Sequence, residues 1–238
     1  MPTISTLRLL QLVEGQAAGA TRFYLPSSGA ADVSPGFNAG WEETGDADRL
    51  KMVTTKISSA MTNKSGTTLI TAGDLLLRQY VSAALEAQTI TGDVKIYARA
   101  SEALATVDAF SRILLKVVSN DGGTVRGTLL SFGDYSTGAE WNTSLRNKSF
   151  ADIDPPTSVT TLDGDRLVLE IGFAHAAVIS SAQINFGDDS STDLSEDETT
   201  TTADNPWLEI GQTLTFQAVG GAAYEPTPFM QPFFMGPV

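Results

Sequence analysis

DRLVLEIGF, residues 165–173, is the stretch that predicts the fold most directly. Every second side chain in it is apolar, namely Leu167, Leu169, Ile171 and Phe173. The opposite positions carry Arg166, Val168 and Glu170. Successive side chains of an extended strand point to opposite faces, so this spacing predicts a β-strand with one face toward a core. A helix would instead need apolar residues three and four apart.

The same two-residue period recurs on both sides of this stretch. VKIYARA at 94–100 and SRILLKVVS at 111–119 alternate in the same way. Further candidate strands lie at 21–25, 49–56, 67–71, 75–82, 125–132, 181–187 and 212–218. Residues that favour turns separate them, and the Asn120-Asp121-Gly122-Gly123 sequence predicts a hairpin between two strands.

About ten short strands with turns at this spacing are typical of a β-sandwich. We therefore predict an all-β fold, a β-sandwich of jelly-roll type, over residues 20–218. Residues 1–19 are expected to form an N-terminal arm or a first strand. Helix is expected at most in short pieces, at 101–110 or 139–147.

Composition excludes several functions. The chain has 15 basic and 28 acidic residues, a net charge of −13, so nucleic acids and anionic membranes would repel it. It has no cysteine, which excludes disulfides and thiolate metal sites. The N-terminal MPTISTLRLLQLVEGQ lacks the basic segment of a signal peptide, and no apolar stretch approaches the length of a membrane span. We therefore expect no membrane partner and production in the cytoplasm.

DDSSTDLSEDETTTTADN, residues 188–205, is acidic and rich in Ser and Thr, and is expected to be a long surface excursion between two late strands. Its carboxylates could collect a hard cation such as calcium. The candidate ligands are Asp188, Asp189, Asp193 and Glu196, with Asp197 and Glu198 beside them. Their spacing misses the EF-hand pattern and lacks its central glycine. A solvated acidic loop is the default interpretation, and a bound calcium ion is the alternative.

His175 is the one histidine in the sequence, so any Ser-His-Asp arrangement would have to use it. It stands between alanines at the end of an apolar strand, which favours a structural role. Gly122-Gly123 is not followed by the lysine of a phosphate-binding loop. Two carboxylates that converge only in three dimensions, as in glycoside hydrolases, stay open. We predict that the chain is not an enzyme and has no cofactor.

Three tryptophans are candidates for a sugar-binding surface. Trp41 and Trp141 each adjoin a glutamate, and Trp207 follows Pro206. An exposed tryptophan beside a carboxylate is typical of carbohydrate sites, where a ring stacks on the sugar. Tryptophan is also common in sandwich cores. We favour packing in a core or interface, because none of the three lies in an aromatic cluster in the sequence.

The chain ends on EPTPFMQPFFMGPV, residues 225–238, which combines prolines with large apolar side chains. Proline excludes a helix interior or a central strand. Residues 219–238 are expected to form an extended docking arm that leaves the sandwich at Gly220-Gly221. Its partner-docking residues are Phe229, Met230, Phe233, Phe234 and Met235. The alternative is that the arm folds back over an open end of its own sandwich.

Six stretches in this order resemble a family of uncharacterised β-rich, jelly-roll-like virion structural proteins of tailed bacteriophages and prophages. They are TRFYL at 21–25, GWEET at 40–44, QTITG at 88–92, VRGTLL at 125–130, Glu140-Trp141 and GDRLVLEIG at 164–172. The resemblance implies a particle protein, such as a capsid decoration or fibre component. It implies no functional residues.

We therefore expect a structural component of a tailed-phage virion, most simply a capsid decoration or cement protein assembled in the host cytoplasm. Its expected partners are the major capsid protein, other virion subunits and copies of itself as a homo-oligomer. The alternative is a receptor- or glycan-binding module of a phage fibre or tail. A hydrolase acting on surface polysaccharide is a third interpretation.

Overall fold

The computed structural model describes residues 19–218 apart from 45–46, 68–70, 137 and 155–156. These residues form an all-β sandwich, as predicted, with one short 3-10 turn (η1, Ala105–Val107) and no α-helix among them. Of the two ranges that could hold a short helical piece, 101–110 contains this turn between strand residues, whereas 139–147 contains no helix and ends in the start of a strand. The predicted N-terminal arm, but for residue 19, and the predicted docking arm lie outside the described residues.

The first sheet is built around β6, which has neighbours on both sides. β13 and β12 pair with successive halves of β6, and β9 pairs with its other side. β1 then pairs with β13, and β3 pairs with β12. The strands are β1 (Thr21–Tyr24), β3 (Thr62–Thr67), β6 (Val94–Glu102), β9 (Arg146–Ile153), β12 (Ser181–Phe186) and β13 (Trp207–Ile210).

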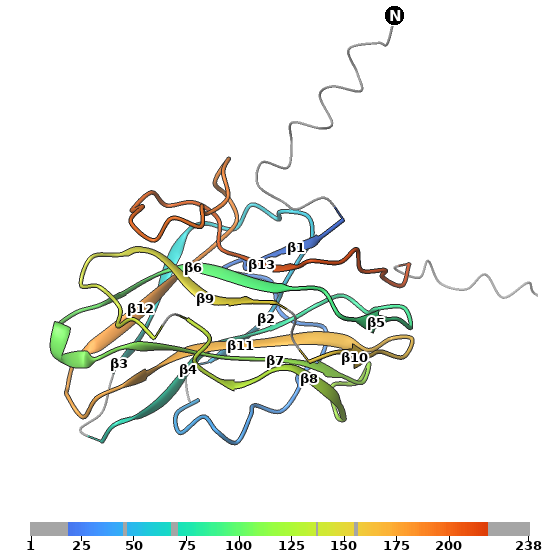
Figure 1. Ribbon diagram of the computed structural model, residues 1–238, viewed down its shortest axis with the longest axis horizontal. Coiled ribbons are helices and arrows are strands. Elements are labelled where there is room, and N and C mark those ends of the chain that lie inside the picture. Colours follow the sequence, from blue (N-terminus) through green and yellow to red (C-terminus); the bar gives the residue numbers. More distant parts are fainter. Residues whose placement is uncertain (1–18, 45–46, 68–70, 137, 155–156, 219–238) are drawn as a thin grey trace, which may run out of the picture.

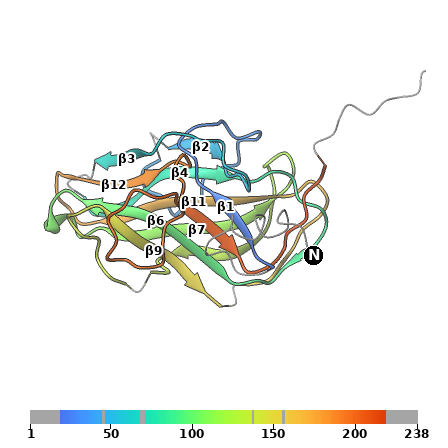
Figure 2. The same cartoon turned by 90° about the horizontal axis from the view of Figure 1, so that it is seen from above.

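The second sheet has the order β2-β4-β11-β7-β8, and only β2 runs parallel to its neighbour. The strands are β2 (Asp48–Lys51), β4 (Gly73–Val81), β7 (Phe110–Val118), β8 (Val125–Gly133) and β11 (Arg166–His175). A separate two-stranded ladder joins β5 (Thr89–Ile90) to β10 (Val159–Thr160). Figures 1 and 2 show the two main sheets as stacked layers.

The connectivity of eight of these strands is that of a jelly roll. Strands β3-β12-β6-β9 of one layer face β4-β11-β7-β8 of the other, and among these eight strands the chain crosses between layers at each step except the β7–β8 hairpin. After that hairpin the chain retraces the same crossings in reverse order, which is the double Greek key of a jelly roll. β1, β2 and β13 widen the two sheets.

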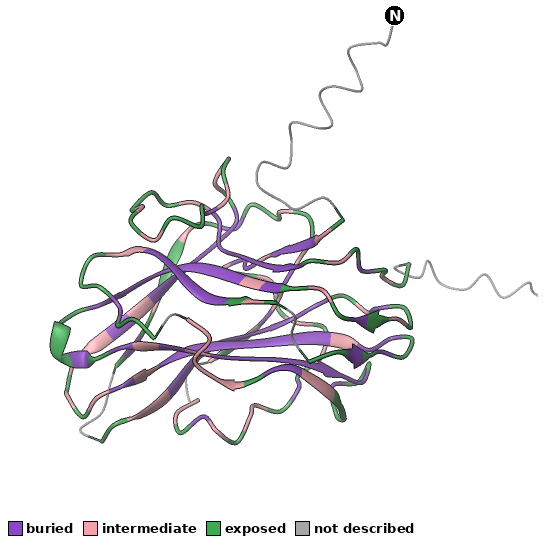
Figure 3. Cartoon of the chain, in the orientation of Figure 1, coloured by how far each residue is buried: buried purple, intermediate pink, exposed green. Residues whose placement is uncertain are grey.

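The core lies between the layers and is supplied by the alternating faces that the sequence predicts. Leu167, Leu169, Ile171 and Phe173 of β11 are all fully buried. They meet the inward face of β6, including Ile96 and Ala98, in one continuous apolar cluster. Figure 3 shows this burial along the central strands of both layers.

The opposite face of β11 is buried as well. Glu170 is fully buried, and its carboxylate accepts hydrogen bonds from Trp41 Nε1 at 2.6 Å and from Lys116 Nζ at 2.8 Å. It also accepts bonds from Gln79 and from the backbone N–H of Asn38. The segment that leads into β2 therefore lies over the second sheet, and this buried polar cluster fixes it there.

Candidate functional site

The four candidate calcium ligands are not brought together. Among the residues that the structure describes, no group of three or more His, Asp or Glu side chains could hold a metal ion. Asp188 accepts hydrogen bonds from Ile57 N and from Ser59, whereas Glu196 pairs with Lys95 at 2.9 Å. Asp189 is exposed. These carboxylates therefore act separately within the fold.

Asp193 illustrates how the acidic segment is fixed. Its carboxylate pairs with Arg22 and Lys56, each at 3.1 Å, and accepts a bond from Asn205. Burial alone would raise the pKa of Asp193, but the bonds from Asn205, Lys56 and Arg22 lower the pKa below its usual value. The carboxylate is therefore held in its charged form.

The acidic segment 188–205 is a largely exposed loop between two late strands, as predicted, although the second strand is β13 and not the one expected at 212–218. Several contacts anchor the loop to the sandwich. Leu194 packs with Tyr97 and Trp207 in a small apolar cluster, and its carbonyl accepts a bond from Trp207 Nε1. Farther along, the Thr200 carbonyl accepts a bond from Asn147 N at 2.9 Å. Glu198 Oε1 accepts one from Ser149 N at 2.8 Å. The segment therefore covers part of the open edge of β9.

All three tryptophans pack inside the protein. Their exposed fractions are 6% for Trp41, 3% for Trp141 and 1% for Trp207. Each ring has aromatic neighbours, which are Phe132 for Trp41, Phe150 and Phe173 for Trp141, and Tyr97 for Trp207. Packing in the core, the interpretation favoured from the sequence, is therefore confirmed. Those partners are distant in sequence and meet only through the sandwich. No stacking platform of exposed tryptophan is present among the described residues.

His175, at the end of β11, is buried. Its Nδ1 lies 2.9 Å from the carbonyl oxygen of Ala176, and its ring packs beside Phe173. Because a carbonyl only accepts, Nδ1 carries the proton in this bond. These contacts anchor the end of the strand, in agreement with the structural role that the sequence favours.

The predicted docking residues Phe229, Met230, Phe233, Phe234 and Met235 lie outside the described residues. The described chain ends at residue 218, beside a groove of about 350 Å³. Phe23, Met52, Val53 and Phe216 supply apolar side chains to the groove. The last described residues therefore lie next to an apolar concavity.

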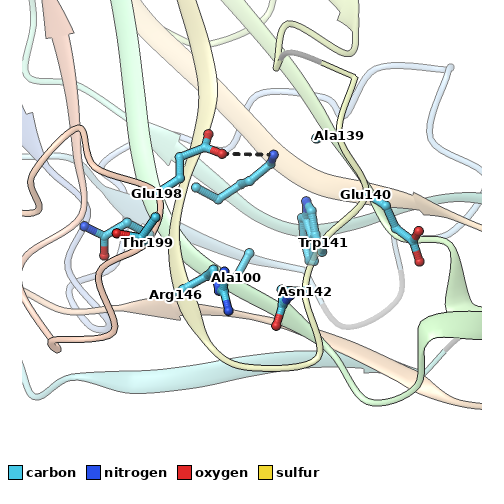
Figure 4. A pocket seen from close by; sticks show the side chains of 10 residues that line it. Ala100, Ala139, Glu140, Trp141, Asn142, Arg146, Glu198 and Thr199 are labelled. Atoms are coloured by element: carbon cyan, nitrogen blue, oxygen red, sulfur yellow. Dashed lines mark hydrogen bonds and ion pairs between the residues drawn. The ribbon is translucent and has the colours of Figure 1, made fainter.

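A polar pocket of about 280 Å³ lies beside Trp141, and we call it the Trp141 pocket (Figure 4). One wall comes from the segment before β9, one from β9 itself, and one from the acidic segment. Its main polar lining residues are Glu140, Arg146, Asn147, Lys148 and Glu198. Ligand pockets usually begin near about 300 Å³, so this one has room for a small ligand only.

The register of β9 explains why two cations line the pocket. Arg146 pairs with Ala100 and Lys148 with Ala98 across the β6–β9 ladder. Paired residues project from the same face of a sheet, so both cations extend on the face where β6 presents these small alanines. Lys148 Nζ pairs with Glu198 at 3.4 Å, whereas the guanidinium of Arg146 has no acceptor among the described residues.

Two buried polar atoms of residues that line the pocket have no hydrogen-bond partner within the described part of the chain. They are Nε of Arg146, a donor, and Oδ1 of Asn147, an acceptor. The amide nitrogen of Asn147 is used, because it donates to the Ser195 carbonyl at 3.0 Å. Because side chains alternate along a strand, Asn147 projects from the face opposite Arg146 and Lys148, so only the unpaired donor of Arg146 belongs to the face that lines the pocket.

Glu140, at the rim of the pocket, forms a carboxyl pair with Glu102. Figure 4 shows its carboxylate directed away from Arg146 and Glu198. Glu102, which is 2% exposed, accepts a bond from Ala109 N. Burial raises the pKa of Glu102 to about 7, and the neighbouring Glu140 carboxyl adds to the increase. Glu140 therefore interacts with Glu102, and the carboxylate beside the cations of the pocket is that of Glu198.

Arg146, Lys148 and Asn147 carry no functional signal in the sequence. The reason is local, because RNKSFADI does not show the clean alternation of a strand. Recognising β9 from its Phe150 and its pairing with β6 would have placed Arg146 and Lys148 on one face. Their proximity to Glu198 depends on the path of the acidic segment and has no signal in the sequence.

No helix among the described residues is long and apolar enough to cross a membrane.

Comparisons with known proteins find no matching family model and no matching curated sequence. Solved structures that resemble the chain include an aminopeptidase from the marine sediment archaeon Thaumarchaeota archaeon, with a TM-score of 0.46 and 11% identity over 80% of this chain. An α-amino acid ester hydrolase has a TM-score of 0.37 and 11% identity over 81% of this chain. A CocE/NonD family hydrolase from Staphylococcus aureus has a TM-score of 0.36 and 10% identity over 80% of this chain. The chain spans 36% of each of these proteins. A likeness this distant supports no conclusion about function.

Proposed function

We propose that this chain is a structural subunit of a tailed-phage virion, most simply a protein that decorates or cements the capsid. It would be made in the host cytoplasm and would bind the major capsid protein, other virion subunits and copies of itself. It would act without catalysis, through burial of apolar surface against the shell.

One observation carries the proposal. GWEET at 40–44 and GDRLVLEIG at 164–172, two of the stretches that resemble the virion family, meet in the structure. Trp41 Nε1 lies 2.6 Å from Glu170, and a side chain at Gly172 would come within 2.9 Å of the Trp41 ring. Two segments that carry the resemblance therefore form one buried contact, which supports reading them as parts of one scaffold.

The fold is compatible with this role, since jelly rolls are a frequent architecture of capsid proteins. The same architecture also serves lectins, so the fold alone does not choose between a shell protein and a glycan-binding module. The receptor- or glycan-binding alternative is favoured by one observation, the polar Trp141 pocket with its unpaired Arg146.

The test is to locate the chain in purified particles. Antibodies against the full-length protein, with gold labelling and low-resolution imaging of intact particles, should place it over the capsid in many copies. Label confined to fibre or tail tips would favour the receptor-binding alternative. Absence of the chain from washed particles that contain the major capsid protein would contradict the proposal.

A further inference from the structure

We propose that the Trp141 pocket binds one acidic sugar unit, with the guanidinium of Arg146 holding its carboxylate. A saccharide site at this position is independent of whether the chain decorates a capsid, because it rests on the pocket alone.

The charge in the pocket favours an anionic group. Lys148 and Glu198 neutralise each other at 3.4 Å, and Glu140 is directed away. The half-buried guanidinium of Arg146 then stands without a carboxylate in a chain whose net charge is −13. A planar guanidinium matches a carboxylate with two parallel hydrogen bonds, which is the strongest pairing available to it.

The remaining polar groups favour hydroxyls around that carboxylate. Asn142 and Thr199, an amide and a hydroxyl, line the pocket. Amide and hydroxyl groups of this kind pair with sugar hydroxyls, which both donate and accept.

The size of the pocket and the burial of Trp141 limit the ligand. A volume of about 280 Å³ admits one sugar ring. Trp141 is 3% exposed, so it offers a ring edge and not a stacking face. Recognition would therefore depend on the carboxylate and hydroxyls, and a neutral sugar should bind poorly.

The experiment titrates the full-length chain with methyl β-D-glucuronide and follows the three tryptophan indole N–H signals by NMR. N-acetylneuraminic acid tests a second acidic sugar, methyl β-D-glucoside tests the neutral ring, and acetate and phosphate test the charge alone. At least one acidic sugar should shift the Trp141 signal and leave those of Trp41 and Trp207 in place. The neutral glucoside should bind at least about tenfold more weakly than the acidic sugar.

Arg146→Gln should weaken acidic-sugar binding by about tenfold or more, because the charged pair is lost. Arg146→Lys keeps the charge but lacks the planar guanidinium, so its affinity should lie between those of the unmodified chain and Arg146→Gln. This variant keeps the test valid if Arg146→Gln perturbs folding. Arg166→Gln, in the other sheet, is the matched control and should bind as the unmodified chain does.

Three results would overturn the inference. They are no Trp141 shift with either acidic sugar, equal binding of acetate or phosphate, and unchanged binding by folded Arg146→Gln. Equal binding of simple anions would mean an anion site without sugar recognition. Unchanged binding by the variant would mean that the sugar lies elsewhere.

Discussion

Two lysine–glutamate pairs show how burial changes the loss of folding stability that follows removal of one charged residue. Lys116–Glu170 measures 2.8 Å and is buried on both sides, whereas Lys95–Glu196 measures 2.9 Å and is largely exposed. Removal of one member of a buried pair leaves an uncompensated charge inside the protein. An exposed pair is screened by water and contributes little.

We therefore expect Glu170→Ala to lower the free energy of unfolding by about 3–5 kcal/mol. Glu196→Ala, the matched control, should lower it by less than about 1 kcal/mol. Urea denaturation of both variants measures the difference. Similar small losses for the two variants would mean that water reaches Lys116 and that the cluster around Glu170 is not closed.

Gly172 is required by close contact between two elements. A Cβ at this position would overlap the Leu75 carbonyl oxygen of β4 and lie 2.9 Å from the Trp41 ring. Because backbone cannot yield without breaking strand pairing, Gly172→Ala should cost about 3 kcal/mol of stability. Gly36→Ala, where a Cβ would meet nothing within 4 Å, should change stability by less than about 0.5 kcal/mol. Equal thermal unfolding of the two variants would contradict the β4–β11 contact.

Glu102 makes a prediction about pH. Its pKa of about 7 exceeds the usual 4.5, so the folded state favours the protonated acid. Between these pH values the unfolded chain releases this proton first, and the folded state loses stability as pH rises. Glu102→Gln mimics the protonated acid, so its stability should not fall with this titration. The stability of the variant relative to the unmodified chain should therefore rise by on the order of 2 kcal/mol between about pH 4.5 and about pH 8. A difference that is constant across this range of urea titrations would contradict the raised pKa.

The elements differ in how well the sequence predicts them, and position in the sheet explains the difference. β6, β7 and β11 are central strands, so each must present a regular apolar face to the core, and the alternation is legible. β3, TNKSGT, is a polar edge strand that exists because β12 offers a partner. Residues 212–218 show the alternation without a ladder, since Phe216 forms only a single bridge to Leu85.

The candidate site lies beyond sequence prediction for a related reason. The Trp141 pocket combines the segment before β9, the strand itself and the later acidic segment. The acidic composition of 188–205 predicted exposure and a possible cation site. The carboxylates instead pair with Arg22, Lys95 and Lys148, whose positions are set by three different strands.

Coverage of the β9 edge by the acidic segment gives a prediction at the same scale. Glu198→Ala removes the acceptor for Ser149 N and the partner of Lys148. Amide hydrogen exchange at Asn147 and Ser149 should accelerate about tenfold, as the edge opens locally by about 1.4 kcal/mol, while β6 stays protected. Asp189→Ala, an exposed carboxylate of the same segment, should leave β9 exchange unchanged. Uniform acceleration across both sheets would mean global destabilisation and not loss of an edge cover.

At the scale of the whole molecule, charge and apolar surface act in opposite directions. A net charge of −13 makes identical subunits repel one another at low salt. Assembly on a particle therefore needs apolar contacts that outweigh the repulsion. Exposed large apolar side chains of the sandwich, such as Ile179 and Val125, are single and scattered. Outside the described residues, the C-terminal sequence 225–238 groups three phenylalanines and two methionines.

We expect a chain truncated after Val219 to lose binding to particles that lack this subunit, with an unchanged melting temperature. Phe229, Phe233 and Phe234 would each contribute about 2 kcal/mol if fully buried against a partner, and many copies would add to one another. Replacing these three residues with serine in the full-length chain is the matched control, because it keeps the length and the prolines. This variant should lose particle binding as the truncated chain does. Co-sedimentation with particles and thermal unfolding of the isolated chain are measured together. A large drop in the melting temperature of the monomer would contradict docking to a partner, and would assign the segment to its own sandwich, where the groove beside Phe216 offers an apolar place for it.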